Sequence, residues 1–283
     1  MRVGAYFILL LTLSANAHAA YSTGYSPKKT ALAGAGRSGV LSESSFVNPA
    51  ALANLKVSEV FAYYAKSRIS DWNAGGKAMV FGAYDGENEF IHAGIAYVKE
   101  ARVRLVNKAN TYADRNEVRM SFGHSLSDTI DIGFTAKYIT RRNLGEETKL
   151  FNGDIGMLLQ LFGDFPVGIT YEDFLERSGE RPPVLSVGGS YRIWEEMSLY
   201  FDGGTVTKGL LKNKKSWAIG AELPLMGEIL LEGGIFSDAV VGMKGKSIGV
   251  MWQGPRTTFH YALRLSNGAP VERDHVFAIS IQI

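Results

Sequence analysis

The chain has 283 residues, no cysteine and nearly balanced charge, with 30 lysines and arginines against 28 aspartates and glutamates. The lack of cysteine excludes thiol catalysis, disulfide bonds, thiolate metal sites and a lipid anchor on an acylated cysteine. The balanced charge gives no strong field that would attract nucleic acid. The 32 glycines, 15 phenylalanines and 13 tyrosines suit a sheet with many turns and an aromatic girdle.

The first 19 residues have the pattern of a secretory signal peptide. Arg2 gives a positive start, residues 6–13 form a short apolar core, and Ala17-His18-Ala19 is a cleavage site of the A-x-A type. The apolar core is too short to span a bilayer. We therefore expect a signal peptide at residues 1–19 and an exported mature chain that begins at Ala20.

Residues 20–55 differ in composition from the rest of the chain. They are rich in alanine, glycine and serine and lack the two-residue alternation of a strand. The side chain of Asn48 can cap a short helix that has Pro49 at its first position. Composition alone allows two interpretations of this segment: a plug packed inside a barrel, or a flexible periplasmic leader.

From residue 57 onward, alternating apolar and polar residues predict β-strands. Residues 273–283 are typical: five larger, mostly apolar side chains face one way, and small or polar ones face the other. Strands that cross an outer membrane need about 9–11 residues and alternate between lipid and lumen. The fourteen predicted strands are 57–66, 77–84, 90–99, 115–124, 130–141, 150–161, 165–172, 183–193, 197–204, 215–225, 228–236, 246–253, 256–266 and 273–283.

The predicted connections alternate between short links of about two to five residues and longer ones, the longest at residues 100–114. Outer-membrane barrels have short periplasmic turns and longer external loops. The sequence therefore predicts an all-β fold, a fourteen-stranded antiparallel transmembrane β-barrel over residues 56–283, in the outer membrane. Residues near 107, 176 and 212 are expected outside the cell, and residues 88 and 128 in the periplasm.

Charged side chains fall on the polar faces of the predicted strands. Because a charge that faces lipid at mid-depth costs about 2–4 kcal/mol, these residues should face the lumen. They could form salt bridges between plug and wall, or they could line a substrate path. The lumen-facing candidates are Arg119, Asp131, Lys137, Arg192, Glu222, Glu232, His260 and Arg264.

No catalytic or metal-binding motif is present. The histidines lack metal-ligand spacing, and there is no nucleophile elbow or phosphate-binding loop. We expect no enzymatic activity, no cofactor and no metal. A hydrolase with a serine, a histidine and an acid at the lipid edge of the barrel is the enzymatic alternative.

A short motif near the N-terminus resembles that of a known family. It consists of an Ala-Gly-Ala-Gly stretch with Gly34 and Gly36, then Glu43, then Asn48-Pro49 followed by Ala-Ala-Leu-Ala. The chain thus resembles the outer-membrane transporters of long-chain fatty acids and other hydrophobic compounds, a superfamily that also includes barrel subunits of the type IX secretion apparatus. The resemblance implies that residues 20–55 form an N-terminal hatch, with short helices, inside the lumen.

The resemblance implies passage of small hydrophobic molecules, such as fatty acids, across the outer membrane. The expected partners are outer-membrane lipid and lipopolysaccharide, the barrel-assembly machinery and a hydrophobic small-molecule ligand, with no nucleic acid. The alternative is a structural or partner-binding barrel, a secretion-system or envelope-complex subunit without a permeant. An apolar lumen pocket next to the hatch would favour transport. A lumen filled by salt bridges, with an apolar patch on the external loops, would favour the alternative.

Overall fold

The computed structural model describes most of the chain beyond the predicted signal peptide. The predicted signal peptide, residues 20–25 of the predicted hatch, and the loop positions 107 and 176 lie outside the described residues. The described residues are 26–39, 43, 46–69, 74–88, 90–106, 109–143, 146–161, 165–175, 182–193, 197–209, 211–240, 242–267 and 271–283.

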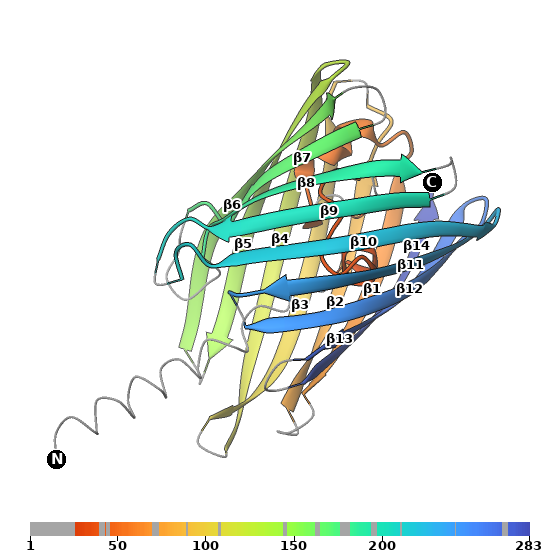
Figure 1. The fold of residues 1–283 in the computed structure, drawn as a ribbon. Coiled ribbons are helices and arrows are strands. Elements are labelled where there is room, and N and C mark those ends of the chain that lie inside the picture. The colour runs from red at the N-terminus through yellow and green to blue at the C-terminus, as the bar shows by residue number, and fades with distance from the viewer. Residues whose placement is uncertain are drawn as a thin grey trace.

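Fourteen antiparallel strands form one closed barrel, which confirms the predicted fold class (Figure 1). Each strand pairs with its neighbours in sequence, and β14 pairs with β1 to close the sheet. The strands are β1 (Glu59–Ile69), β2 (Ala74–Asp85), β3 (His92–Val106), β4 (Ala109–Ser127), β5 (Ile130–Asn143), β6 (Glu146–Leu161), β7 (Phe165–Glu172), β8 (Val184–Ile193), β9 (Met197–Val206), β10 (Lys215–Met226), β11 (Ile229–Asp238), β12 (Met243–Gln253), β13 (Thr257–Ser266) and β14 (Glu272–Gln282).

The alternation of the sequence is reproduced as an inner and an outer face. On β14, Val276 is buried in the lumen, whereas Phe277 and Ile279 on either side of Ala278 are exposed on the outside. On the neighbouring β13, His260 is buried and Phe259 is exposed. The outer surface therefore carries the apolar belt that a lipid environment requires.

The prediction of a fifteen-residue external loop at 100–114 is wrong. β3 continues to Val106 and β4 begins at Ala109, so a long hairpin replaces the loop. β6 likewise begins at Glu146, four residues before the predicted strand. The physical reason is that backbone hydrogen bonds extend these hairpins past the membrane, where no apolar face is needed to mark a strand.

Two short helices precede the barrel: α2 (Pro27–Ala31) and the 3₁₀-helix η2 (Pro49–Asn54). The described residues between Ser26 and Asn54, called the plug below, lie inside the barrel, where Figure 1 draws them in red and orange. α2 packs against β11 to β14, and η2 against β3 to β6. Nearly all plug side chains are buried, including charged ones.

Among the described residues, no helix is long and apolar enough to cross a membrane.

The two ends of the barrel differ in their connections, which sets its orientation. The C-terminal Ile283 donates a backbone hydrogen bond to Ser58 at the end that holds the tight turns at residues 128–129 and 227–228. In outer-membrane barrels such turns face the periplasm. We therefore assign this end to the periplasm and the opposite end to the cell exterior.

Cysteine labelling tests the orientation, because the native chain has no cysteine. A membrane-impermeant maleimide should label Lys212→Cys in intact cells. Asn88→Cys should react only after the outer membrane is permeabilised. Labelling of Asn88→Cys but not Lys212→Cys in intact cells would show the reverse orientation.

Candidate functional site in the barrel lumen

The plug rests directly on glycines of the barrel wall. Gly123, Gly133 and Gly156 lie on β4, β5 and β6, and a Cβ atom at any of them would overlap η2 or its capping residue. A glycine inside a strand weakens the strand, and its usual reason is the close approach of another backbone. A second set, Gly220, Gly234 and Gly249 on β10 to β12, lies in the same way beneath residues 31–33.

Asn48 caps η2 and also fastens it to the wall. Its side chain is fully buried. The Oδ1 atom accepts a hydrogen bond from the backbone N–H of Ala50 at 3.1 Å. The Nδ2 atom donates to the carbonyl of Arg37 at 2.9 Å and to the carbonyl of Met157, on β6, at 3.1 Å. The residue thus has a wall-binding role beyond the predicted cap.

Lys28 of α2 is the main charge that the plug inserts into the wall of β10 and β11. Its Nζ atom pairs with Glu222 and lies 2.7 Å from Oε1 of Glu232. Burial by itself lowers the pKa of the Lys28 ammonium, but the charges of Glu232 and Glu222 outweigh it and raise the pKa above its usual range. Lys28 is therefore charged over the whole physiological pH range.

Glu43 and His260 complete this first polar cluster. The Nε2 atom of His260 lies 2.6 Å from Oε2 of Glu232, and its Nδ1 atom lies 3.8 Å from Oε1 of Glu43. Glu43 also accepts hydrogen bonds from the hydroxyl of Ser26 and from the backbone N–H of Lys28 at 3.0 Å. The cluster joins two separate parts of the plug to β10, β11 and β13.

Arg37 anchors the plug to the neighbouring part of the wall, on β7 and β9. The chain reverses after α2 through Gly34 and Gly36, whose φ angles of 104° and 117° are accessible mainly to glycine. This reversal carries the Arg37 guanidinium to Glu172 on β7 at 2.7 Å and to Asp202 on β9 at 2.8 Å.

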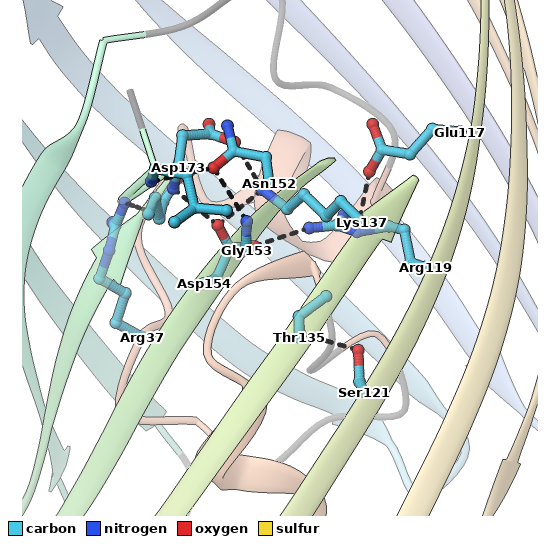
Figure 2. Close-up of polar contacts among 12 residues, drawn as sticks. Arg37, Glu117, Arg119, Ser121, Thr135, Lys137, Asn152, Gly153, Asp154 and Asp173 are labelled. Atoms are coloured by element: carbon cyan, nitrogen blue, oxygen red, sulfur yellow. Dashed lines mark hydrogen bonds and ion pairs between the residues drawn. The ribbon is translucent and has the colours of Figure 1, made fainter. Parts of the chain in front are cut away.

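A third cluster lies on the inner wall itself (Figure 2). Arg119 of β4 lies 3.0 Å from Asp154 of β6. Lys137 of β5 lies between Asp154, at 2.6 Å, and Asp173, at 2.9 Å. Asp173 follows β7 and has a positive φ of 55°. Glu172 thus binds the plug while the next residue, Asp173, binds the wall.

One sector of the inner wall is apolar, which is unusual because barrel interiors are mostly polar. It lies on the adjoining strands β14, β1, β2 and β3. Phe46 of the plug covers it, with ring centroids 6.5 Å from Phe61 and 6.2 Å from Tyr63. The apolar sector consists of Phe61, Tyr63, Ala65, Ala78, Val80, Tyr84, Ala96, Val98, Val276 and Ala278.

Two cavities adjoin the plug. The larger, of about 950 Å³, lies toward the periplasmic end and is lined by mixed charges and polar groups, among them Lys28, Glu43, Arg192 and Glu222. The smaller, of about 110 Å³, lies beside Arg37 and Phe236. The described lumen thus combines a polar periplasmic vestibule with an apolar sector beside the plug.

The predicted site residues are distributed over these features. Asp131 accepts a hydrogen bond from Asn54 of the plug at 2.6 Å, and Arg264 lies over the ring of Phe236 at 4.0 Å. Gly34, Gly36, Glu43, Asn48 and Pro49 belong to the plug as described above. Of the other lumen candidates, Arg119 and Lys137 belong to the wall cluster, Glu222, Glu232 and His260 to the first polar cluster, and Arg192 to the larger cavity.

Sequence reasoning missed Lys28, Arg37, Phe46, Glu172 and Asp173. A signal for the first existed: Ser26-Pro27 is a typical helix start, and Ser26 does accept a hydrogen bond from the N–H of Lys29 at 3.1 Å. The charges of a small-residue segment inside a barrel must also find partners on the wall. Which wall residues those partners are depends on the position of the plug, which no local pattern specifies.

No protein-family model and no curated protein sequence matches this chain. The structure is nevertheless similar to solved outer-membrane transport barrels. The CymD monoaromatic hydrocarbon channel matches with a TM-score of 0.73 and 12% identity, over 93% of this chain and 98% of that one. The Ralstonia pickettii toluene transporter TbuX matches with a TM-score of 0.71 and 12% identity, over 92% of this chain and 99% of that one. A Pseudomonas aeruginosa FadL homologue matches with a TM-score of 0.65 and 10% identity, over 90% of this chain and 97% of that one.

The fold is therefore shared with solved barrels described as a monoaromatic hydrocarbon channel and a toluene transporter. At such low identity the likeness concerns the fold. It agrees with the resemblance that the N-terminal motif indicated.

The glycine contact can be tested by adding one methyl group. In Gly133→Ala the new Cβ would overlap Pro49, so the plug must shift, and overpacking of this kind costs about 1–3 kcal/mol. Trypsin, which can cut at Lys28 and Arg37, should cleave the variant faster than the native protein in detergent. Gly203→Ala on β9 is the control, because its nearest neighbouring atom is 4.0 Å away. Equal protection of both variants would contradict the contact.

The double role of Asn48 predicts an unusual ranking of substitutions. Asn48→Ala removes the cap and leaves two carbonyls without a donor, which should destabilise the plug by about 2 kcal/mol or more. Asn48→Asp retains the capping oxygen but has no donor, so it should be no more stable than the alanine variant. Hydrogen exchange at the amides of residues 50–55 measures the change. Native-like protection in Asn48→Asp would show that only the cap matters.

Proposed function

We propose that the protein lies in the outer membrane and allows small hydrophobic molecules to pass through its lumen. The observation that carries this proposal is the apolar sector on the inner wall. A barrel that conducts only water-soluble solutes has a polar interior and gains nothing from apolar side chains facing the lumen. The similarity to proteins described as monoaromatic hydrocarbon and toluene channels supports the same conclusion.

The proposed path follows the apolar sector past Phe46. A hydrophobic permeant on this surface replaces contacts between Phe46 and the wall with contacts of its own, so it does not need to enter the charged clusters. From there the large cavity leads to the periplasm. The strand pairing is closed all the way round, so exit into the periplasm is favoured over exit through the wall.

The second candidate is a structural or partner-binding barrel. The three charged clusters favour it, because two of them hold the plug to strands between β7 and β13 and all three place mixed charges in the lumen. The two candidates differ in what the apolar sector does: a scaffold needs it only for packing, and a transporter needs it as a surface for the permeant.

Polar substitutions of equal shape separate the two. Val80 and Val98 are paired neighbours in the sector and are fully buried. The double variant Val80→Thr/Val98→Thr keeps the shape and the strand propensity but adds two hydroxyls, which bind water that a permeant must displace. Uptake of labelled toluene or oleate by cells that produce the protein should fall about fivefold, which corresponds to about 1 kcal/mol.

Val206→Thr is the matched control, since Val206 is buried on the inner face of β9, away from the sector. It should leave uptake unchanged. Phe46→Ala should raise uptake, because the side chain that covers the sector is shortened. Uptake that equals the background of cells without the protein, in the native chain and in Phe46→Ala, would exclude transport and leave the structural barrel.

A further inference from the structure

The outer face of the barrel carries a one-signed charge patch near its external end. Seven cations point outward from the external ends of β12, β14, β1, β2 and β3. In each strand, the residues directly before and after each cation face the lumen. Within the described part of the chain, none of the seven forms an ion pair. These residues, called the cation patch, are Lys66 and Arg68 on β1, Lys77 on β2, Lys99 on β3, Lys244 and Lys246 on β12, and Arg273 on β14.

The strand register brings like charges face to face. Lys66 lies directly opposite Lys77, and Arg68 lies directly opposite Arg273. Like charges at directly opposite positions destabilise a sheet. Elsewhere on the barrel, the outward cations Arg142 and Lys149 lie 3.2 Å and 3.4 Å from the carboxylate of Glu147. Among the described residues, no acid lies beside the cation patch on the outward rows of its strands, so an external anion is needed to balance its charge.

An apolar groove of about 580 Å³ begins immediately below the patch on the same strands. On β1 the outward row passes from Lys66 to Tyr64, and on β2 from Lys77 to Met79. One step of the alternation, about 7 Å, therefore separates a cation from the groove. Trp252, Phe259 and Phe277 form other parts of the groove wall. The combination is a charged head site above an apolar cleft that faces the membrane.

We propose that the cation patch and the groove bind the lipid A part of lipopolysaccharide. Its phosphates contact the lysines and arginines, and one of its acyl chains lies in the groove. The assignment to the outer leaflet follows from the orientation of the barrel. The patch extends from β12 to β3, about 24 Å at the usual strand spacing. That width suits a disaccharide with two phosphates better than the single phosphodiester of a phospholipid.

This proposal needs the outer-membrane location but not transport, so the two can fail separately. The test uses the full-length barrel purified in detergent and delipidated, with binding measured by native mass spectrometry. The probes are bisphosphorylated hexaacyl lipid A, its monophosphoryl form, its deacylated disaccharide and phosphatidylglycerol. The variant is Lys66→Gln/Arg68→Gln/Arg273→Gln, in which both like-charge contacts are relieved and folding should not suffer.

Lipid A should bind the native barrel, and the triple variant should bind it at least tenfold more weakly. Arg142→Gln/Lys149→Gln, which removes cations outside the patch, should retain native affinity. The monophosphoryl form and the deacylated disaccharide should each bind the native barrel at least fivefold more weakly than lipid A. These last two comparisons need no variant, so they remain decisive if the triple variant does not fold.

Two results would overturn the proposal. Equal binding of lipid A by the native barrel and the triple variant would show that the patch does not hold the phosphates. Equal affinity for phosphatidylglycerol and lipid A would show a general anionic-lipid surface instead of a lipid A site. Uptake of hydrophobic compounds bears on neither result.

Discussion

The pairing of buried charges is the interaction on which the rest of the structure depends. A charged group taken out of water is stable only with a partner, and removing one partner of a buried pair costs about 3–5 kcal/mol. The plug directs Lys28 to β10 and β11 and Arg37 to β7 and β9, and each meets two carboxylates from different strands. Charge matching therefore fixes the position of the plug, and the buried side chains of Leu32, Phe46 and Leu52 pack it against the wall.

Close approach makes this matching possible. Alanine and glycine in the plug, and glycine on the wall, bring backbone against backbone. Water is then excluded from the contact, and the ion pairs beside it gain strength in the lower dielectric. The bend at Asp173, directly after β7, extends the same network: Glu172 binds the plug, Asp173 binds Lys137, and the plug is connected through them to the wall cluster. The glycines and the charges therefore act together to hold the plug in place.

The sequence was sufficient to predict the strands of the barrel, but it did not predict the contacts inside the lumen. Strands such as β13 and β14 could be predicted because lipid on one side and the lumen on the other impose alternation at every residue. The β3–β4 hairpin could not be predicted, because outside the membrane that constraint ends and only backbone hydrogen bonds remain. The partners of Lys28 and Arg37 could not be predicted either, because they come from strands about 130–200 positions further along the chain. Asn48 was identified as a cap, but its bond to Met157 depends on the same long-range placement.

The magnitudes also indicate which part of the plug can move. Displacing the whole plug would break the pairs of Lys28 and of Arg37, each at about 3–5 kcal/mol. Turning the ring of Phe46 away from the apolar sector exposes one aromatic side chain, at about 1.5–3 kcal/mol. Its cation–π contact with Arg119, at 4.5 Å, adds about 1 kcal/mol, and Arg119 keeps its pairs with Glu117 and Asp154. A hydrophobic permeant that takes the place of the ring restores most of the lost apolar contact. The least costly way to open the lumen is therefore a rotation of Phe46, with the charged anchors of the plug left in place.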